Sequence, residues 1–202
     1  MFLKNESRTI HCSGALVHPE FVISAAHCFT KKDIHNPPWN NITVAFGLDD
    51  VSLINAAYLA LVIQKRKIAT VHFHDGYTFP QAYRDVVLVK LKKPVILTAQ
   101  VYPICLPEVV DPKPNSMRNH LVTLVGYGPD LRKKNEEKAT KLNLINQKIL
   151  PRRFCAFKHN HKLADDFKVS LKLKSTFPRL FRDGLICAGL RSDSKEGTCN
   201  RD

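Results

Sequence analysis

The stretch SGALVHPEFVISAAHC, residues 13–28, decides the fold of this chain. It holds two runs rich in aliphatic and aromatic residues, SGALVHP and EFVISA, which meet at a proline and a glutamate. Runs of this kind, separated by turn-forming residues, predict β-strands at hairpin spacing. The second run leads into AAHCF, where we expect a short turn that carries His27 and Cys28.

Similar runs continue along the chain. They are NITVAFG (41–47), AYLALVIQK (57–65), KIATVHFH (67–74), DVVLVKL (85–91) and LVTLVGYG (121–128). Helical pattern is scarce, and its best candidate is residues 152–168. The polar, proline-bearing stretch 109–119 indicates a loop or a connector between two halves. The sequence therefore predicts an antiparallel all-β fold, with two packed barrels as one form it could take.

Length and charge narrow the class of protein. The chain has 202 residues, 44% of them hydrophobic, which suits one large domain with a sizeable core. Its formal net charge of +13 is typical of a solvated surface. The more specific alternative is that the basic residues bind a sulfated glycan. The basic clusters lack interleaved aromatic residues, which argues against a nucleic-acid partner. No apolar run approaches the ~20 residues that span a bilayer.

The cysteines point to an oxidising compartment. Six are scattered along the chain without a C-x-x-C pair, so a zinc ribbon or a thioredoxin-like site is not expected. Scattered, even-numbered cysteines favour disulfides, and two N-x-S/T sequons, at Asn5 and Asn41, agree with secretion. The start, MFLKNESRTI, lacks the apolar core of a signal peptide. We therefore expect an extracellular protein whose leader is missing from this sequence.

Two residues could carry acid–base chemistry. His27 lies in the expected turn, and Asp85 comes directly before an apolar strand. A carboxylate there could accept the Nδ1 proton of a histidine, which would fix the tautomer and stabilise the imidazolium ion. The alternatives are a core histidine and an aspartate that caps a strand, and spacing alone does not decide between them.

Five motifs together resemble one known family. SGALVHPEFVISAAHC resembles the segment around the catalytic histidine of chymotrypsin-like serine proteases, and RDVVLVKLKKPV resembles the stretch around their catalytic aspartate. YPICLP, VGYG and ICAGL follow in the family's order. The resemblance implies that His27 is the general base and Asp85 its orienting carboxylate. It also implies two antiparallel six-stranded barrels, the second incomplete at the C-terminus, with residues 1–95 as first barrel, 96–119 as connector and 120–202 as second barrel.

The resemblance also implies how the cysteines pair. Two disulfides within the chain would be Cys12–Cys28 and Cys155–Cys187. Cys105 matches a cysteine that tethers the catalytic domain to an upstream segment in multidomain members. Cys199 matches one whose partner lies further downstream. Both would be unpaired within this chain, as expected of a fragment.

The end of the sequence departs from the family pattern. ICAGLRSDSKEGTCNRD aligns with the family's Cys-x-Gly-Asp-Ser-Gly-Gly segment, so that Asp202 matches the aspartate just before the nucleophile serine. Arg201 takes the place of a glycine whose N–H helps to form the oxyanion hole, where a larger residue is strained. Gly197 lies where trypsin-like members carry the pocket-floor aspartate, so a preference for Arg or Lys is not expected. No Ile/Val-Val-Gly-Gly activation sequence precedes Cys12.

These departures set the functional hypotheses. Cys-Asn-Arg-Asp resembles non-catalytic serine protease homologues of arthropods with clip domains. The leading hypothesis is therefore a secreted, non-catalytic domain that acts as a binding partner or cofactor in an extracellular proteolytic cascade. The alternative is a genuine serine endopeptidase whose sequence is cut before the nucleophile, and Arg201 is the residue that separates the two. A third hypothesis is a glycan-binding module built on the same fold. The resemblance implies neither a metal ion nor another cofactor.

Overall fold

A computed structural model describes residues 2–5, 12–29, 39, 42–55, 62–78, 84–107, 119–127, 141–151 and 186–189, the first of these ranges by its backbone. The chain divides into two units. One consists of Met1–Glu108, Gly126–Asn143 and Thr198–Asp202, and the other of Val109–Val125 and Leu144–Gly197. The helix predicted over residues 152–168 lies outside the described ranges. Within those ranges, no helix is long and apolar enough to cross a membrane.

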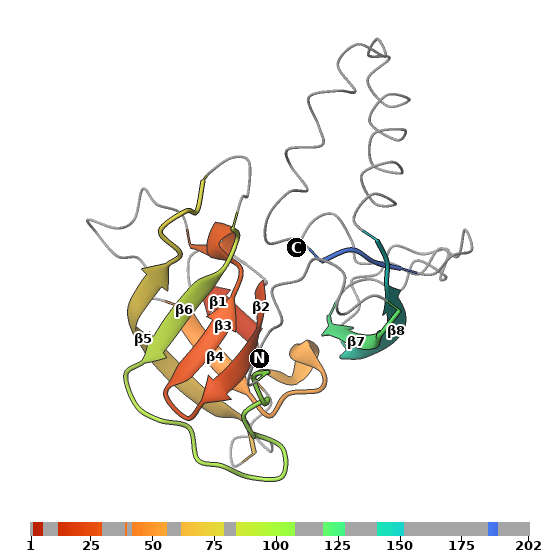
Figure 1. The fold of residues 1–202 in the computed structure, drawn as a ribbon. Helices are drawn as coiled ribbons and strands as arrows, with labels where there is room; N and C mark the ends of the chain where they lie inside the picture. The colour runs from red at the N-terminus through yellow and green to blue at the C-terminus, as the bar shows by residue number, and fades with distance from the viewer. Residues whose placement is uncertain are drawn as a thin grey trace, which may run out of the picture. The chain divides into compact units, whose positions relative to one another are not determined.

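The first unit holds a closed antiparallel barrel of six strands (Figure 1). The strands are β1 (Phe2–Asn5), β2 (Cys12–His18), β3 (Phe21–Ser24), β4 (Ile42–Phe46), β5 (Gln64–Phe73) and β6 (Val87–Leu91). Their order around the barrel is β1-β2-β3-β6-β5-β4, and β4 pairs back onto β1. The barrel confirms the all-β class and the first of the two predicted barrels.

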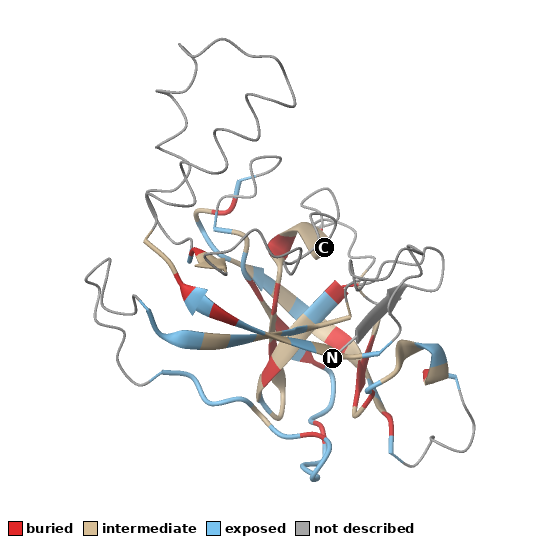
Figure 2. Ribbon diagram, turned by 90° about the vertical axis from the view of Figure 1, so that its right-hand side faces the viewer, coloured by how far each residue is buried: buried red, intermediate tan, exposed pale blue. Residues whose placement is uncertain are grey.

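Alternation along these strands builds the core. Strands of this barrel point every second side chain inward, so buried positions alternate with more exposed ones (Figure 2). The largest fully buried side chains on β3 to β6 are branched aliphatic residues: Val22, Val44, Ile68, Val87, Val89 and Leu91. Branched side chains fill a small barrel well because they are stiff and pack closely against the pleated surface.

Two strands of the barrel, β5 and β1, differ from the sequence-based expectation. The runs 57–65 and 67–74 were expected to be separate strands, but Gln64–Phe73 forms one continuous strand, β5. A register shift between Ile68 and Thr70 lets this long strand bend around the barrel. The short β1 was not predicted, because its four residues carry no clear alternation. It forms because β2 and β4 each offer it a backbone edge.

Gly47 allows the chain to turn out of β4. Its φ is +74°, and a Cβ there would lie 2.9 Å from the carbonyl oxygen of Val62 and 3.2 Å from Cγ2 of Val101. Gly47→Ala should therefore destabilise the protein by about 2 kcal/mol or more, through both strain and contact with backbone. Chemical denaturation would measure this, with Gly126→Ala as the matched control because nothing lies within 4 Å of a Cβ at Gly126. Equal stability of the two variants would contradict the prediction.

A later segment of the first unit returns to the barrel. The hydroxyl of Tyr127 donates a hydrogen bond to the carbonyl of Leu48, and the amide of Leu142 donates to the carbonyl of Asp49 over 2.7 Å. Burial, followed by the nearby charge of Asp49, raises the pKa of Tyr127. Lys141 forms an isolated β-bridge with Asp50. These contacts hold Tyr127, Lys141 and Leu142 beside the loop that follows β4.

The second unit contains a three-stranded sheet in the order β7-β8-β9. The strands are β7 (Leu121–Gly126), β8 (Asn143–Ile149) and β9 (Ala188–Gly189), and β8 pairs antiparallel with β9. Three described strands agree with an incomplete second barrel of the predicted two-barrel fold. β8 and β9 were not predicted from the sequence. In β8, NLINQKI, polar amide side chains interrupt the alternation of apolar and polar residues, and β9, Ala188–Gly189, is only two residues long.

Candidate active site around His27 and Asp85

His27 lies on η1 (Ala26–Cys28), a single 3₁₀ turn that directly follows β3. The amide of Phe29 donates to the carbonyl of Ala26 over 2.9 Å, and Ala26 is fully buried against the core. The small alanine lets the backbone of this turn lie directly on the barrel interior. The histidine-bearing turn expected at AAHCF is therefore present, and its backbone is held by the core beneath it.

A disulfide ties this turn to the neighbouring strand. Cys28 is bonded to Cys12 of β2, sixteen positions earlier in the sequence. Close by, the hydroxyl of the buried Ser24 donates to the carbonyl of Ser13 over 2.7 Å, which adds a second link between β3 and β2. The backbone on both sides of His27 thus has little freedom, which is what a catalytic imidazole requires.

Strand register brings Asp85 to the histidine. β3 and β6 are antiparallel, and Ser24 pairs with Val87. Continuing this register past Ser24 and back from Val87 sets Asp85 opposite the 3₁₀ turn. Residues 58 positions apart therefore meet at one end of the barrel.

Both oxygens of the Asp85 carboxylate are used by His27. The backbone N–H of His27 donates to Oδ1 over 2.8 Å, and Nδ1 of the ring lies 2.6 Å from Oδ2. An ionised carboxylate can only accept hydrogen bonds, so in the neutral form of the ring this contact assigns the proton to Nδ1 and leaves the lone pair on Nε2. The two side chains are 33% and 22% exposed, which keeps the imidazole within reach of a substrate.

Tyr77 borders the carboxylate and was not singled out in the sequence. It is 2% exposed, and its ring stacks on that of Phe73 with centroids 5.9 Å apart. Burial is the main cause that raises the pKa of Tyr77, and the negative charge of Asp85 adds to the effect. The hydroxyl of Tyr77 therefore stays neutral beside Asp85 at neutral pH. Its turn, HFHDGY, carries no signal that single-sequence reasoning could have used.

One trio of potential metal ligands lies at the same place. Single donor atoms of Cys12, His27 and Cys28 lie within 4.8 Å of one another. The two sulfurs are joined in the disulfide, and the ring Nδ1 faces Asp85. Neither thiolate is available as a ligand, so these residues do not fit a zinc site.

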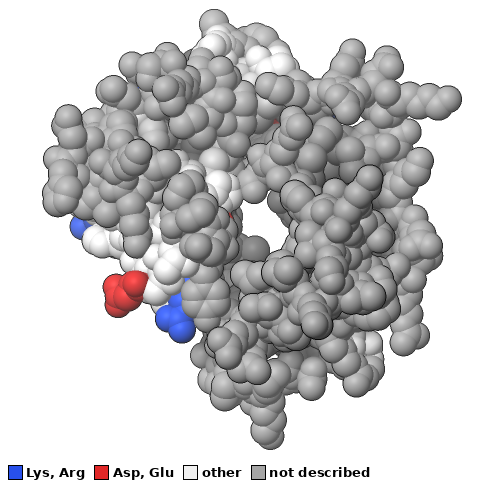
Figure 3. Space-filling model, turned by 90° about the horizontal axis from the view of Figure 1, so that it is seen from above, with Lys and Arg blue, Asp and Glu red and all other residues white. Residues whose placement is uncertain are grey.

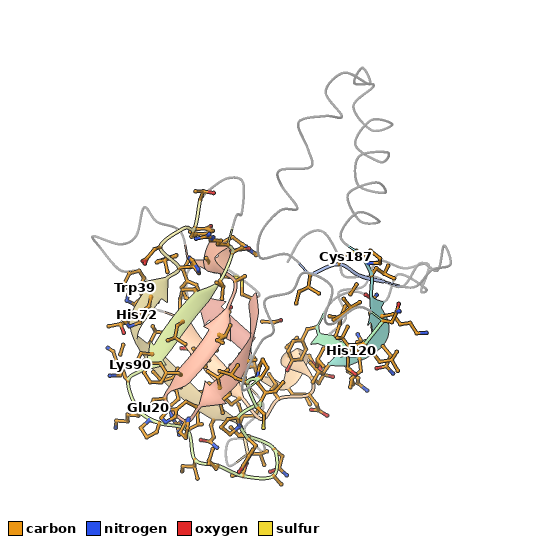
Figure 4. All side chains as sticks on the ribbon, viewed as in Figure 1. Glu20, Trp39, His72, Lys90, His120 and Cys187 are labelled. Atoms are coloured by element: carbon orange, nitrogen blue, oxygen red, sulfur yellow. A yellow bond between two sulfur atoms is a disulfide. The ribbon has the colours of Figure 1, made fainter. Side chains whose placement is uncertain are left out.

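Two basic side chains on the strands of the first barrel contact other groups of the fold. The guanidinium of Arg66 donates to the carbonyls of Pro94 and Lys65 and to the side chain of Gln64. The ammonium of Lys90 lies 5.9 Å from the ring centre of Phe21, on the outer surface of the barrel (Figure 4). On the face drawn in Figure 3, described charged side chains lie mainly at one edge. No arrangement of these groups into a glycan site is evident in the described part of the chain.

The remaining predicted residues are distributed as follows. Cys105 is an exposed free thiol, and Cys187 is buried and disulfide-bonded in the second unit (Figure 4). The backbone of Asn5 ends β1, opposite Ile42. The other residues lie outside the described ranges: Asn41, Cys155, Gly197, Cys199, Arg201 and Asp202.

Comparison with known proteins shows which family model and which proteins this chain is similar to. The family model described as Trypsin matches residues 1–202. Human transmembrane protease serine 11B is 33% identical over 118 residues, which cover 58% of this chain and 24% of that protein. Clotting factor C of Tachypleus tridentatus is 28% identical over 145 residues, which cover 70% of this chain and 13% of that protein. The chain thus spans about a quarter or less of the length of these relatives.

Proposed function

Since this chain belongs to the trypsin family, we propose that it carries the histidine and aspartate of an extracellular serine endopeptidase active site. His27 is the general base, and Asp85 orients it and stabilises its protonated form. The observation that supports this most is the double contact of the Asp85 carboxylate with the ring and the backbone of His27, at 2.6 and 2.8 Å. A histidine kept for packing alone has no need of a carboxylate aligned with Nδ1.

The chemistry follows from the free Nε2. When a serine hydroxyl attacks the scissile carbonyl carbon, Nε2 accepts its proton and the ring becomes an imidazolium ion. The Asp85 carboxylate stabilises this charge through the Nδ1 proton. Nε2 then donates the proton to the leaving amine, and a second cycle with water releases the acyl group. In the family motif the serine follows the aspartate that matches Asp202.

Specificity and partners come from the same resemblance. Gly197 at the pocket-floor position offers no carboxylate to a basic P1 side chain, so an apolar P1 residue fits better. The name of one relative, clotting factor C, supports a place in an extracellular proteolytic cascade, with other proteins of that cascade as substrates or partners. The exposed Cys105 fits the family position that tethers the domain to an upstream segment.

A second candidate function rests on one residue. Arg201 stands where the family has the oxyanion-hole glycine, and loss of one such donor costs roughly 10²–10³ in turnover. On this view the domain is a non-catalytic partner or cofactor in a cascade, and the His27–Asp85 pair is a retained feature of the fold. A fluorophosphonate probe separates the two candidates, because only the first predicts a reactive nucleophile serine.

The test uses the protein as its source organism produces it. We expect a fluorophosphonate probe to label one serine, and the labelled protein to lose hydrolysis of peptides with an apolar P1 residue. Labelling should be blocked by prior treatment with an unlabelled fluorophosphonate. A folded protein that neither reacts with the probe nor cleaves these peptides would support the non-catalytic candidate instead.

A further inference from the structure

The residue before Asp85 has an unusual backbone conformation. Arg84 has φ of +51°, a left-handed value that residues other than glycine rarely adopt. The amide of Val86 donates to the carbonyl of Arg84 over 2.7 Å, which closes a three-residue turn with Asp85 at its centre. The direction of the Asp85 side chain therefore depends on how firmly Arg84 is held.

A second turn lies against the first. The amide of His74 donates to the carbonyl of Val86 over 3.3 Å and so links the two turns. Within the second turn, the amide of Gly76 donates to Nδ1 of His74 over 3.0 Å, and the amide of Tyr77 donates to its carbonyl over 2.8 Å. Because Tyr77 is buried and stacked on Phe73, this turn is anchored in the barrel.

The side chain of Arg84 lies directly over Gly76. A Cβ at Gly76 would come within 2.6 Å of Nη1, 2.7 Å of Cδ and 3.2 Å of Cζ of Arg84. The space that any other residue would fill with its side chain is thus taken by the arginine. φ is not positive at Gly76, so the close approach of Arg84, not the backbone conformation, is what calls for glycine there.

We propose that the contact between Arg84 and Gly76 positions Asp85, by clamping the left-handed residue that precedes the carboxylate onto a turn anchored in the barrel. Arg84 and Gly76 are positioning residues, since they act on the reaction through Asp85 and His27. This inference deepens the proposed function and rests on it for the effect on catalysis. The clamp itself is a property of the folded chain and can be observed without activity.

The first test replaces Gly76 with alanine. A Cβ there displaces the Arg84 side chain, so the Asp85 carboxylate should lose its fixed place against the ring. In NMR spectra of the full chain, the hydrogen-bonded Nδ1 proton of His27 should broaden or disappear. In the active protein, kcat should fall about 10- to 100-fold with KM unchanged, because misplacement of a catalytic group impairs the chemical step. Gly126→Ala, with open space around its Cβ, should change neither readout.

A second variant keeps the test decisive if Gly76→Ala folds poorly. Arg84→Gly accepts the positive φ and removes the guanidinium without any clash. It should also broaden the Nδ1 resonance, and adding Gly76→Ala to it should cause little further change, because both substitutions remove the same contact. An unchanged resonance in Arg84→Gly, or fully additive effects of the two substitutions, would overturn the clamp.

The two proposals can fail separately. If the resonance responds as described in a protein that cleaves no peptide, the endopeptidase assignment fails and the clamp stands. If the protein cleaves peptides but neither the Nδ1 resonance nor kcat changes in Gly76→Ala and Arg84→Gly, the clamp fails and the endopeptidase assignment stands.

Discussion

The His27→Ala variant should lose peptide hydrolysis, with kcat reduced by on the order of 10⁴-fold or more. Alanine leaves no group to take the proton from the nucleophile, and no neighbouring side chain in the described structure can replace Nε2. Initial rates with a peptide substrate, at saturating concentration, measure the effect. KM should change little, because the ring acts on the reacting hydroxyl and contributes little to ground-state binding.

Asp85→Asn offers a finer version of the same test. Its side chain has nearly the same shape, but an amide in place of Oδ2 can donate to Nδ1 and would favour the wrong tautomer. The expected loss in kcat is also on the order of 10⁴-fold, as the same change costs in other triads of this type. Circular dichroism should show an unaltered fold. Variants of His27 and Asp85 that both retain full hydrolysis would contradict the endopeptidase assignment at its centre.

Removal of the Cys12–Cys28 disulfide should produce the largest loss of stability. The bond closes a loop over a sequence separation of 16, and cross-linking a loop of that size stabilises a protein by about 3 kcal/mol. The Cys12→Ala, Cys28→Ala double variant should therefore unfold at a lower denaturant concentration. Its activity should fall as well, because η1 loses its covalent link to β2.

Cys105→Ala provides the control for that measurement. Cys105 is an exposed free thiol, so its replacement should change the free energy of unfolding by no more than about 0.5 kcal/mol. Comparing the two proteins under non-reducing conditions isolates the disulfide from the general effect of losing a cysteine side chain. A disulfide-free protein as stable as the Cys105→Ala control would show that the hairpin and the core hold η1 without help.

Much of the first barrel was predictable from local pattern. Strands β2, β3, β4 and β6 each combine branched side chains with turn formers at their ends, and these signals depend only on neighbours in the sequence. The short turn at His27 was also predicted. β1 was missed because four residues carry too little pattern, and its strand conformation depends on pairing with β2 and β4.

The backbone conformation and the contacts around Asp85 could not be predicted from the sequence. Arg84 and Gly76 look like ordinary surface residues in the sequence, and nothing in RDVVLVKL or HFHDGY predicts that the side chain of Arg84 covers Gly76. Arg84 has its positive φ at the place where two hydrogen-bonded turns meet. Local propensity would have favoured a glycine or an asparagine at that position, so only the assembled structure reveals it.

What the sequence by itself determined was the chemistry available: a histidine after a strand, a carboxylate before another, and cysteines suited to disulfides. What only the tertiary structure decided was that the imidazole and the carboxylate meet, 58 positions apart, with both oxygens engaged. The physical reason is that strand pattern reports which face of the chain is buried, whereas the partner and the register of each strand follow from closing the whole barrel around one core.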